Sequence, residues 1–468
     1  MTHFDRYSTN GIYNLFSHKI AIKSWKDIAT FVHEFYHHVQ NSATVHGAER
    51  FNLLMQLLSH TSNLCSSYEN ICLPINKWFE KEKDNENFNP KLKKRLDEIV
   101  YHQDFWAFMD KMPYPYANSE YTNQLSLELT EDAFFGGNPF LAMLDDTDFL
   151  IKHLNFAPES DHSYTPYIII HSEESKKLIG YGVGGFTIME SGAYALQLFH
   201  EKKGEEILNF LSDPEKRPYL LVLYYVYQFI DDFSVACLLT FLVCDLSMCL
   251  STPAVGFLLV AQLVAETTKP NMTVQEAFEW YNFHFVETLN EEIQNSFTLE
   301  RQVIEDIKKQ TANRLTEHSL DDAFVYELSL MEKAFQYSDI EKRLPFLYLL
   351  TIAKDEKDIY KLLTFFETTV IEIDEHYHCN SEINYDAYTL FNAVSDLFIG
   401  LCRDFNYILN RPQIAKHFVK QDYNTYRIEI KVENGNSDEY GYLLHTFGLQ
   451  NKTITFLEAN KPVDFRRE

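Results

Sequence analysis

The sequence predicts a mostly helical α+β fold, and two observations lead to that prediction. Apolar residues recur every three or four positions through most of the chain, which is the spacing of one helix face. Strand signals are confined to three short stretches, namely 11–23, 166–186 and 426–447. The chain has 468 residues, of which 46% are hydrophobic, so it can bury a large core and we expect a packed globular protein.

The amino-terminal elements can be placed by their start signals. A short strand within 11–23 leads to a helix for which Ser24 is the expected N-cap, with Asp27 as the acidic residue of its first turn. Polar and turn-forming residues mark the ends of the elements that follow. They are expected to be a helix at about 49–65, an exposed charged loop at 80–89, a helix at about 90–112, and a hairpin of strands 166–171 and 178–186.

Residues 219–250 are apolar enough to be mistaken for a membrane span. Asp231, Asp232 and Asp245 interrupt the stretch, whereas a bilayer crossing needs about 20 consecutive apolar residues. We therefore expect buried helices of a globular domain. Asp232 and Asp245 are each expected to bond a helix end or an arginine; the alternative is a hydrogen bond from a metal-bound histidine.

The pattern changes to amphipathic helices with clear starts after about residue 253. Thr273 with Glu276, and Ser319 with Asp322, have the spacing of capping boxes. The chain is expected to end in a small β unit at 426–447. We place a domain boundary near residue 270, which divides the chain into domain 1–270 and a mainly helical domain 271–468.

The segment His33-Glu34-Phe35-Tyr36-His37 is an HExxH motif. Residues four apart lie about 40° apart around a helix, so both imidazoles can bind one divalent ion. Glu34 can then accept a proton from a water that the ion has made acidic. The alternative is a helix that happens to carry histidines. His38 is turned about 140° from His33, so we interpret it as a packing residue.

A catalytic zinc also needs a third protein ligand, for which Glu190 is the best candidate. It is followed by the small residues Ser191, Gly192 and Ala193, which would let its helix approach the motif helix closely. Its neighbours are otherwise apolar, which favours a buried position over the alternative of an exposed glutamate on a surface helix.

The segment HEFYHHVQ, residues 33–40, together with Glu190-Ser191-Gly192-Ala193, resembles the HExxH…ExxA signature of zincin-like zinc metallopeptidases with a glutamate third ligand. It is similar in particular to bacterial families in which a glutamine stands two or three residues after the second histidine. The resemblance covers two short segments. It implies a zincin-like metallopeptidase domain over 1–270, His33, His37 and Glu190 as zinc ligands and Glu34 as general base. Tyr36 is a departure, because several of these families have glycine there.

The function expected from these residues is that of a zinc-dependent peptidase or related hydrolase acting on a peptide or protein. Tyr194 and His171 are candidates for the donor that stabilises the oxyanion. The stretch 166–186 is a candidate for the strand that holds substrate in extended form, with a structural hairpin as the alternative. Two other functions stay open: a non-catalytic binding or regulatory protein that uses its carboxy-terminal helices, with a structural or decayed metal site, and an effector or defence-type protease with a single target.

The formal net charge of −27 argues against a nucleic acid or an anionic membrane as partner, because binding to phosphates requires lysine and arginine. A basic peptide or protein suits this charge better than a nucleic acid does; the alternative, which we favour over a steering role, is a generally acidic surface. The amino terminus lacks the basic start and apolar core of a signal peptide, so a cytoplasmic location is expected.

Seven cysteines are scattered without the paired spacing of a zinc ribbon or a disulfide framework, which is typical of a reducing compartment. His376-Tyr377-His378-Cys379 contains metal-binding residue types. It lies among acidic residues and has no partner of matching spacing elsewhere. We therefore expect a solvated loop there.

Overall fold

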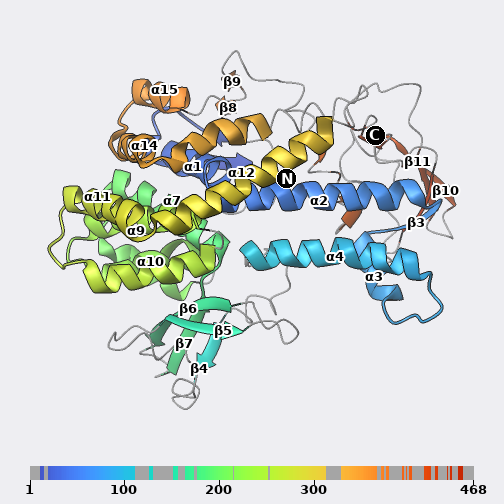
Figure 1. Ribbon diagram of the computed structural model, residues 1–468, viewed down its shortest axis with the longest axis horizontal. Coiled ribbons are helices and arrows are strands. Elements are labelled where there is room, and N and C mark those ends of the chain that lie inside the picture. Colours follow the sequence, from blue (N-terminus) through green and yellow to red (C-terminus); the bar gives the residue numbers. More distant parts are fainter. Residues whose placement is uncertain are drawn as a thin grey trace. The chain divides into compact units, whose positions relative to one another are not determined.

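The computed structural model describes residues 11–14, 19–110, 126–129, 151–155, 164–172, 177–213, 216–250, 253–312, 328–365, 370–373 and 376–378, and beyond these 393–394, 397, 400–402, 416–422, 427–430, 440, 443–444, 449 and 452–456. Helices predominate among them (Figure 1). The prediction of a mostly helical fold is thereby confirmed.

Internal contacts divide the chain into two compact units, each assembled from separate stretches. Unit 1 comprises residues 1–50, 107–310 and 328–383, and unit 2 comprises 51–106, 311–327 and 384–468. The expected boundary at residue 270 falls inside unit 1. The assignment of separate functions to 1–270 and 271–468 stays a prediction.

Unit 1 contains most of the helices and two of the sheets. Its helices are α1 (Ile28–Ser42), α7 (Gly185–Glu201), η3 (Glu205–Ser212), α8 (Arg217–Tyr227), α9 (Phe233–Met248), α10 (Pro253–Thr267), α11 (Val274–Phe283), the π-helical turn η4 (His284–Thr288), α12 (Asn290–Ala312), η5 (Phe335–Ser338), α14 (Ile340–Ile352) and α15 (Glu356–Phe365). Helix α7 is central, because it packs against α1, α8, α9 and α10.

The first sheet of unit 1 has the strand order β1-β2-β8-β9. Its strands are β1 (Gly11–Asn14), β2 (Lys19–Ile22), β8 (Val370–Ile373) and β9 (His376–His378). Strands β1 and β2 form an antiparallel hairpin, and β2 pairs in parallel with β8. Both strands of the hairpin pack on α1. Among the described strands, β1 therefore stands at an edge of this sheet, directly beside the motif helix.

The second sheet of unit 1 confirms the predicted hairpin and extends it. Its order is β4-β7-β6-β5, made of β4 (Ser126–Leu129), β7 (Lys177–Gly182), β6 (Tyr164–Ser172) and β5 (Ile151–Asn155). All its neighbouring strands are antiparallel. Since β6 and β7 each have a partner on both sides, neither offers a free edge on which a substrate strand could pair.

Unit 2 contains the expected helices of 49–65 and 90–112. They are α2 (Val45–Ser67), which begins in unit 1, and α4 (Pro90–Asp110); between them lies α3 (Ile75–Glu82), which takes up the start of the expected loop. The sheet β10-β11-β12-β3 joins β10 (Phe418–Asp422), β11 (Arg427–Ile430) and β12 (Thr453–Phe456) to β3 (Asn70–Leu73). A terminal β unit is present, but among the described residues only β11 of it lies within the expected 426–447; Leu443 and Leu444 are helical, and β11 pairs with β10 and β12 instead. The last strand, β12, pairs in parallel with β3.

Two local predictions are corrected. Asp27, three residues after the expected Ser24, is the N-cap of α1, because its side chain accepts the Thr30 N–H at 3.1 Å. Ser24 instead closes a turn before the helix by accepting the Lys26 N–H. Residues His376–His378 form strand β9 and not a loop, because they pair antiparallel with the strand just before them, β8.

The stretch 219–250 folds into α8 and α9, and α9 is buried along nearly its whole length. No described helix has the length and apolar character needed to cross a membrane. Asp232 caps α9 by accepting the Val235 N–H at 3.0 Å, and Asp245 pairs with Arg343. The expectation of a helix end and an arginine as their partners is confirmed. Thr273 and Glu276 form the predicted capping box; Ser319 and Asp322 lie outside the described residues.

Candidate metal centre

The HExxH motif lies in the middle of α1, as a metal-binding role requires. All five residues from His33 to His37 are buried. Helix α1 presents Phe31, Phe35 and Val39 to the core, and the two histidines share the face directed at α7. His38 is 1% exposed and packs against the rings of Tyr13 and Phe35. The interpretation of His38 as a packing residue is confirmed.

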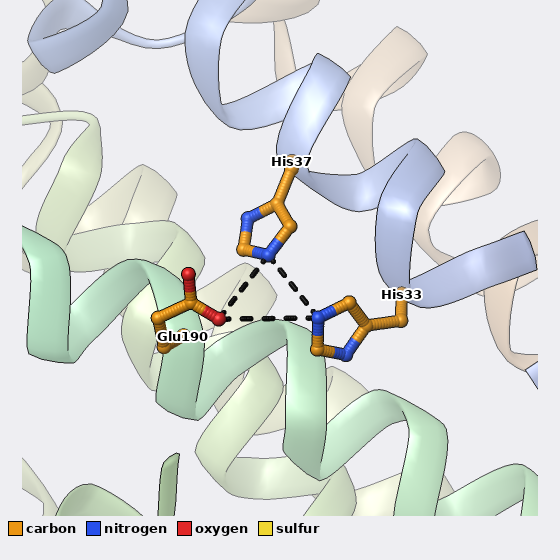
Figure 2. A group of neighbouring side chains, drawn as sticks. All are labelled: His33, His37 and Glu190. Carbon is orange, nitrogen blue, oxygen red and sulfur yellow. Dashed lines mark hydrogen bonds and ion pairs between the residues drawn. The ribbon is translucent and has the colours of Figure 1, made fainter. Parts of the chain in front are cut away.

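Glu190 on α7 meets both motif histidines, although 153 positions separate it from the second of them in the chain. The His33 Nε2 and His37 Nε2 atoms are 3.2 Å apart, and Glu190 Oε2 lies 3.4 Å from His37 Nε2 and 3.9 Å from His33 Nε2 (Figure 2). A tetrahedral zinc with ligands at 2.0–2.2 Å separates them by about 3.3–3.6 Å. The three measured distances lie on either side of this range, and the three groups could hold one metal ion.

Glycine and other small residues allow α7 to approach α1 this closely. A Cβ atom on Gly192 would lie 2.8 Å from Cys244 Cβ and 3.2 Å from the Tyr36 ring. Ser191, Ala193 and Ala195 are fully buried. The sequence predicted a close approach through these small residues, and the packing has that form.

Gln40 fixes the hydrogen-bonding state of His37. The Gln40 Nε2 donates to the backbone carbonyl of Met189 at 3.0 Å, so its Oε1 is turned to His37 Nδ1 at 2.8 Å. An amide oxygen only accepts hydrogen bonds, so Nδ1 carries the proton. In the neutral ring the Nε2 lone pair then points at Glu190, which is the form that binds a metal. Gln40 thereby joins His37 to the residue that precedes Glu190.

The electrostatics of the site favour a positive charge between the three groups. Burial lowers the pKa of His37, but the charge of Glu190, its hydrogen bond and Glu34 outweigh that effect and leave the pKa raised. Burial and the neighbouring His37 hold the pKa of His33 well below its ordinary value. His33 is therefore neutral, and its nitrogen can act as a metal ligand. The carboxylate of Glu190 beside His37 favours a cation in the space between them. Two imidazoles and a carboxylate are a donor set that suits Zn²⁺.

Glu34 and strand β1 lie against each other at the same site. A Cβ on Gly11 would fall 2.9 Å from the Glu34 carboxylate and 2.4 Å from Thr30 Cγ2, so only glycine lets the strand pass here. Two residues further, the Tyr13 ring stacks over His37 at 6.3 Å. The sequence indicated a strand in this region but gave it no role. Its position just before the motif helix is the signal that was overlooked.

Both candidates for an oxyanion donor stay predictions, and only Tyr194 has a described side chain. Tyr194 lies one helical turn after Glu190, and its ring meets His33 edge-on at 6.5 Å. Burial raises the pKa of its phenol, so Tyr194 keeps a proton to donate at neutral pH. His171 lies on β6, opposite Leu178 of β7; its side chain is outside the described part of the structure, and its role stays a prediction.

Comparison of the chain with protein-family models, with curated proteins and with solved structures gave no match in any of the three.

Proposed function

We propose that this chain is a zinc-dependent hydrolase of peptide bonds, with His33, His37 and Glu190 as the zinc ligands. The observation that carries the proposal is the convergence of two histidine nitrogens and a glutamate oxygen from helices α1 and α7. When bound, zinc would supply a Lewis acid that polarises the scissile carbonyl and makes a water molecule acidic.

The residues around the ligands suit the remaining steps of hydrolysis. Glu34 takes the proton of the attacking water and passes it to the leaving amine. Tyr194 donates a hydrogen bond to the developing oxyanion. Strand β1 lies at a sheet edge beside Glu34 and His37. In this proposal β1, and not the stretch 166–186, is the strand that holds the substrate in extended form. The formal charge of −27 suits a basic peptide or protein.

A pair of carboxylate-to-amide substitutions tests the proposal. Wild-type protein is expected to bind one zinc per chain and to cleave members of a basic peptide library. Glu190→Gln removes a ligand oxygen and should weaken zinc binding strongly. Glu34→Gln makes the same chemical change beside the ligands; it should keep the zinc and reduce cleavage by roughly 10²–10⁴-fold. The measurements are zinc content by mass spectrometry, zinc affinity by chelator competition, and peptide cleavage.

Three results would each overturn a part of the assignment. The ligand set is wrong if zinc is absent from wild type, or if His33→Ala and Glu190→Gln bind it as tightly as wild type does. The general-base role of Glu34 is wrong if Glu34→Gln cleaves the same peptides at the same rate.

A structural metal site is a second candidate, and one observation favours it. His33, His37 and Glu190 are only 8%, 6% and 7% exposed, and structural zinc sites are closed whereas catalytic ones keep a position open. A site of this kind would bind zinc with undiminished affinity in Glu34→Gln and would cleave no peptide in either form. An effector with one target would instead cleave a single protein in a mixed proteome, and only with Glu34 intact.

A further inference from the structure

Tyr36, which lies between the two motif histidines, belongs to a buried polar cluster on another side of α1. Its ring is fully buried and packs edge-to-face on Phe241 at 4.7 Å. Its hydroxyl donates to Asp245 Oδ1 of α9 at 3.3 Å. The bulky residue at the position where related motifs have glycine therefore has a specific polar partner.

Asp245 is the centre of this cluster and is fully buried. Arg343 of α14 binds its carboxylate with both arms, Nε to Oδ2 and Nη2 to Oδ1, each at 2.7 Å. The Tyr281 hydroxyl of α11 donates to Oδ2 at 2.6 Å. Four donors from three helices therefore surround one carboxylate, and the paired geometry of the guanidinium fixes its orientation.

The same guanidinium also holds the end of α1 directly. Its Nη1 donates to the backbone carbonyl of Ala43, the C-cap residue of α1, at 3.0 Å and to that of Tyr337 at 3.1 Å. Arg343 is 1% exposed. It therefore contacts α1 at two places: at its C-terminus through Ala43 and, through Asp245, at Tyr36 between the histidines.

Helix α9 connects this cluster to the other ligand helix. Cys244, the neighbour of Asp245, packs on Gly192 of α7, two residues from Glu190. Adjacent residues of α9 thus contact the helix that carries the two histidines and the helix that carries the glutamate. The position and rotation of α1 relative to α7 set whether three ligand atoms meet, and errors of about 1 Å disable such sites.

We propose that Arg343 and Asp245 are positioning residues of the metal centre, which hold α1 through Tyr36 and Ala43 at the rotation that brings His33 and His37 to Glu190. The inference rests on the proposed zinc function. A buried ion pair adds little net stability compared with an apolar pair of similar volume, but it can impose one arrangement on the elements that it joins. The cluster accordingly acts on the precision of the site. Helix α14, which follows the expected domain boundary, is part of the metal-binding machinery.

The test compares two tyrosine-to-phenylalanine variants. Tyr36→Phe removes only the hydroxyl that reaches Asp245. Tyr225→Phe is the matched control: its hydroxyl is also buried and donates to the Ala261 carbonyl at 2.8 Å, linking α8 to α10 in the same unit. Zinc dissociation constants are measured by chelator competition, and apoprotein stability by denaturant unfolding. Tyr36→Phe should weaken zinc binding roughly three- to tenfold, while Tyr225→Phe, though destabilised, should stay within about twofold of wild type.

Arg343→Lys keeps the charge but loses the two-armed contact, and it should weaken zinc binding at least as much as Tyr36→Phe. If this variant fails to fold, the two tyrosine variants decide the question alone. The positioning role is overturned if Tyr36→Phe loses apoprotein stability yet binds zinc as tightly as wild type, or if Tyr225→Phe weakens zinc binding equally. A wild type that binds no zinc would instead refute the proposed function, and the inference with it.

Discussion

Gln40 is the residue whose side chain touches both halves of the candidate site. Its amide oxygen accepts from His37 Nδ1, and its amide nitrogen donates to the carbonyl of Met189 beside Glu190. Because the second bond fixes which end of the amide faces His37, the tautomer of the imidazole follows from a contact made on another helix.

Replacing Gln40 by leucine is therefore expected to weaken zinc binding by roughly 10–100-fold. Gln40→Glu should lose less, since a carboxylate still accepts from His37 Nδ1 although it cannot donate to Met189. Gln294→Leu is the control, because Gln294 of α12 also donates to a backbone carbonyl. Its acceptor is the carbonyl of Ser338 in η5, at 3.2 Å. Chelator competition gives the affinities. Equal loss in Gln40→Leu and Gln294→Leu would exclude an orienting role for Gln40.

At the scale of single residues, the sequence predicted the features that depend only on residues close together in the chain. His33, Glu34 and His37 follow from helical spacing, and the box of Thr273 and Glu276 from its three-residue separation. The N-cap of α1 shows the limit. Ser24 and Asp27 are both good capping residues, and the choice between them depends on where the chain leaves β2, which the local sequence does not contain.

At the scale of elements, the packing of α7 depends on the absence of a side chain at Gly192. A Cβ atom at this position would meet both Tyr36 of α1 and Cys244 of α9. The predicted substitution is Gly192→Ala. Alanine favours a helix over glycine by about 1 kcal/mol, but its methyl group would lie 2.8 Å from Cys244 Cβ, and overpacking a core typically costs about 1–3 kcal/mol.

We therefore expect Gly192→Ala to lower the free energy of unfolding and to weaken zinc binding, because α7 carries Glu190. Cys244→Ala would not relieve the clash, since the nearest atom is a Cβ that alanine retains. Gly204→Ala is the control: there the added carbon would meet only the flexible carboxylate end of Glu206. The measurements are denaturant unfolding and zinc affinity. A Gly192→Ala protein as stable as wild type would show that α7 can shift without cost.

Pairings between distant strands and helices explain why the sequence did not predict the rest of the architecture. Strand β2 pairs in parallel with β8, with Lys19 opposite Val370, and Arg343 finds Asp245 across 98 positions. Hydrophobic periodicity reports only which face of an element is buried. It carries no information on which partner covers that face. The edge position of β1 beside Glu34 is such a tertiary property, and so is the position of β6 and β7 between two other strands of their sheet.

For the whole molecule, two carboxyl groups that are buried or partly buried predict how stability depends on pH. Glu49 of α2 and Glu300 of α12 both belong to unit 1. Burial raises the pKa of Glu49 to about 9, and the charge of Glu300 adds to this effect. Burial raises the pKa of Glu300 to about 7. Among the described residues the Oε2 atom of Glu300 has no hydrogen-bond partner, so no hydrogen bond from them to this atom stabilises the ionised carboxylate.

Proton binding sets the sign of the change in unfolding free energy with pH. Between the ordinary pKa of 4.5 and these raised values, the folded chain binds more protons than the unfolded chain, so the free energy of unfolding falls as pH rises. The two groups favour folding fully below about pH 4.5, and this contribution is lost as pH passes through 7 and then 9.

Glu300→Gln stays neutral and also removes the charge that acts on Glu49. Its unfolding free energy should exceed that of wild type by more than about 1 kcal/mol at pH 9 and should differ little at pH 5. Denaturant unfolding at several pH values gives the comparison, with Glu305→Gln as an exposed control on the same helix. Parallel pH profiles for wild type and Glu300→Gln would mean that Glu300 ionises in the folded protein at its ordinary pKa.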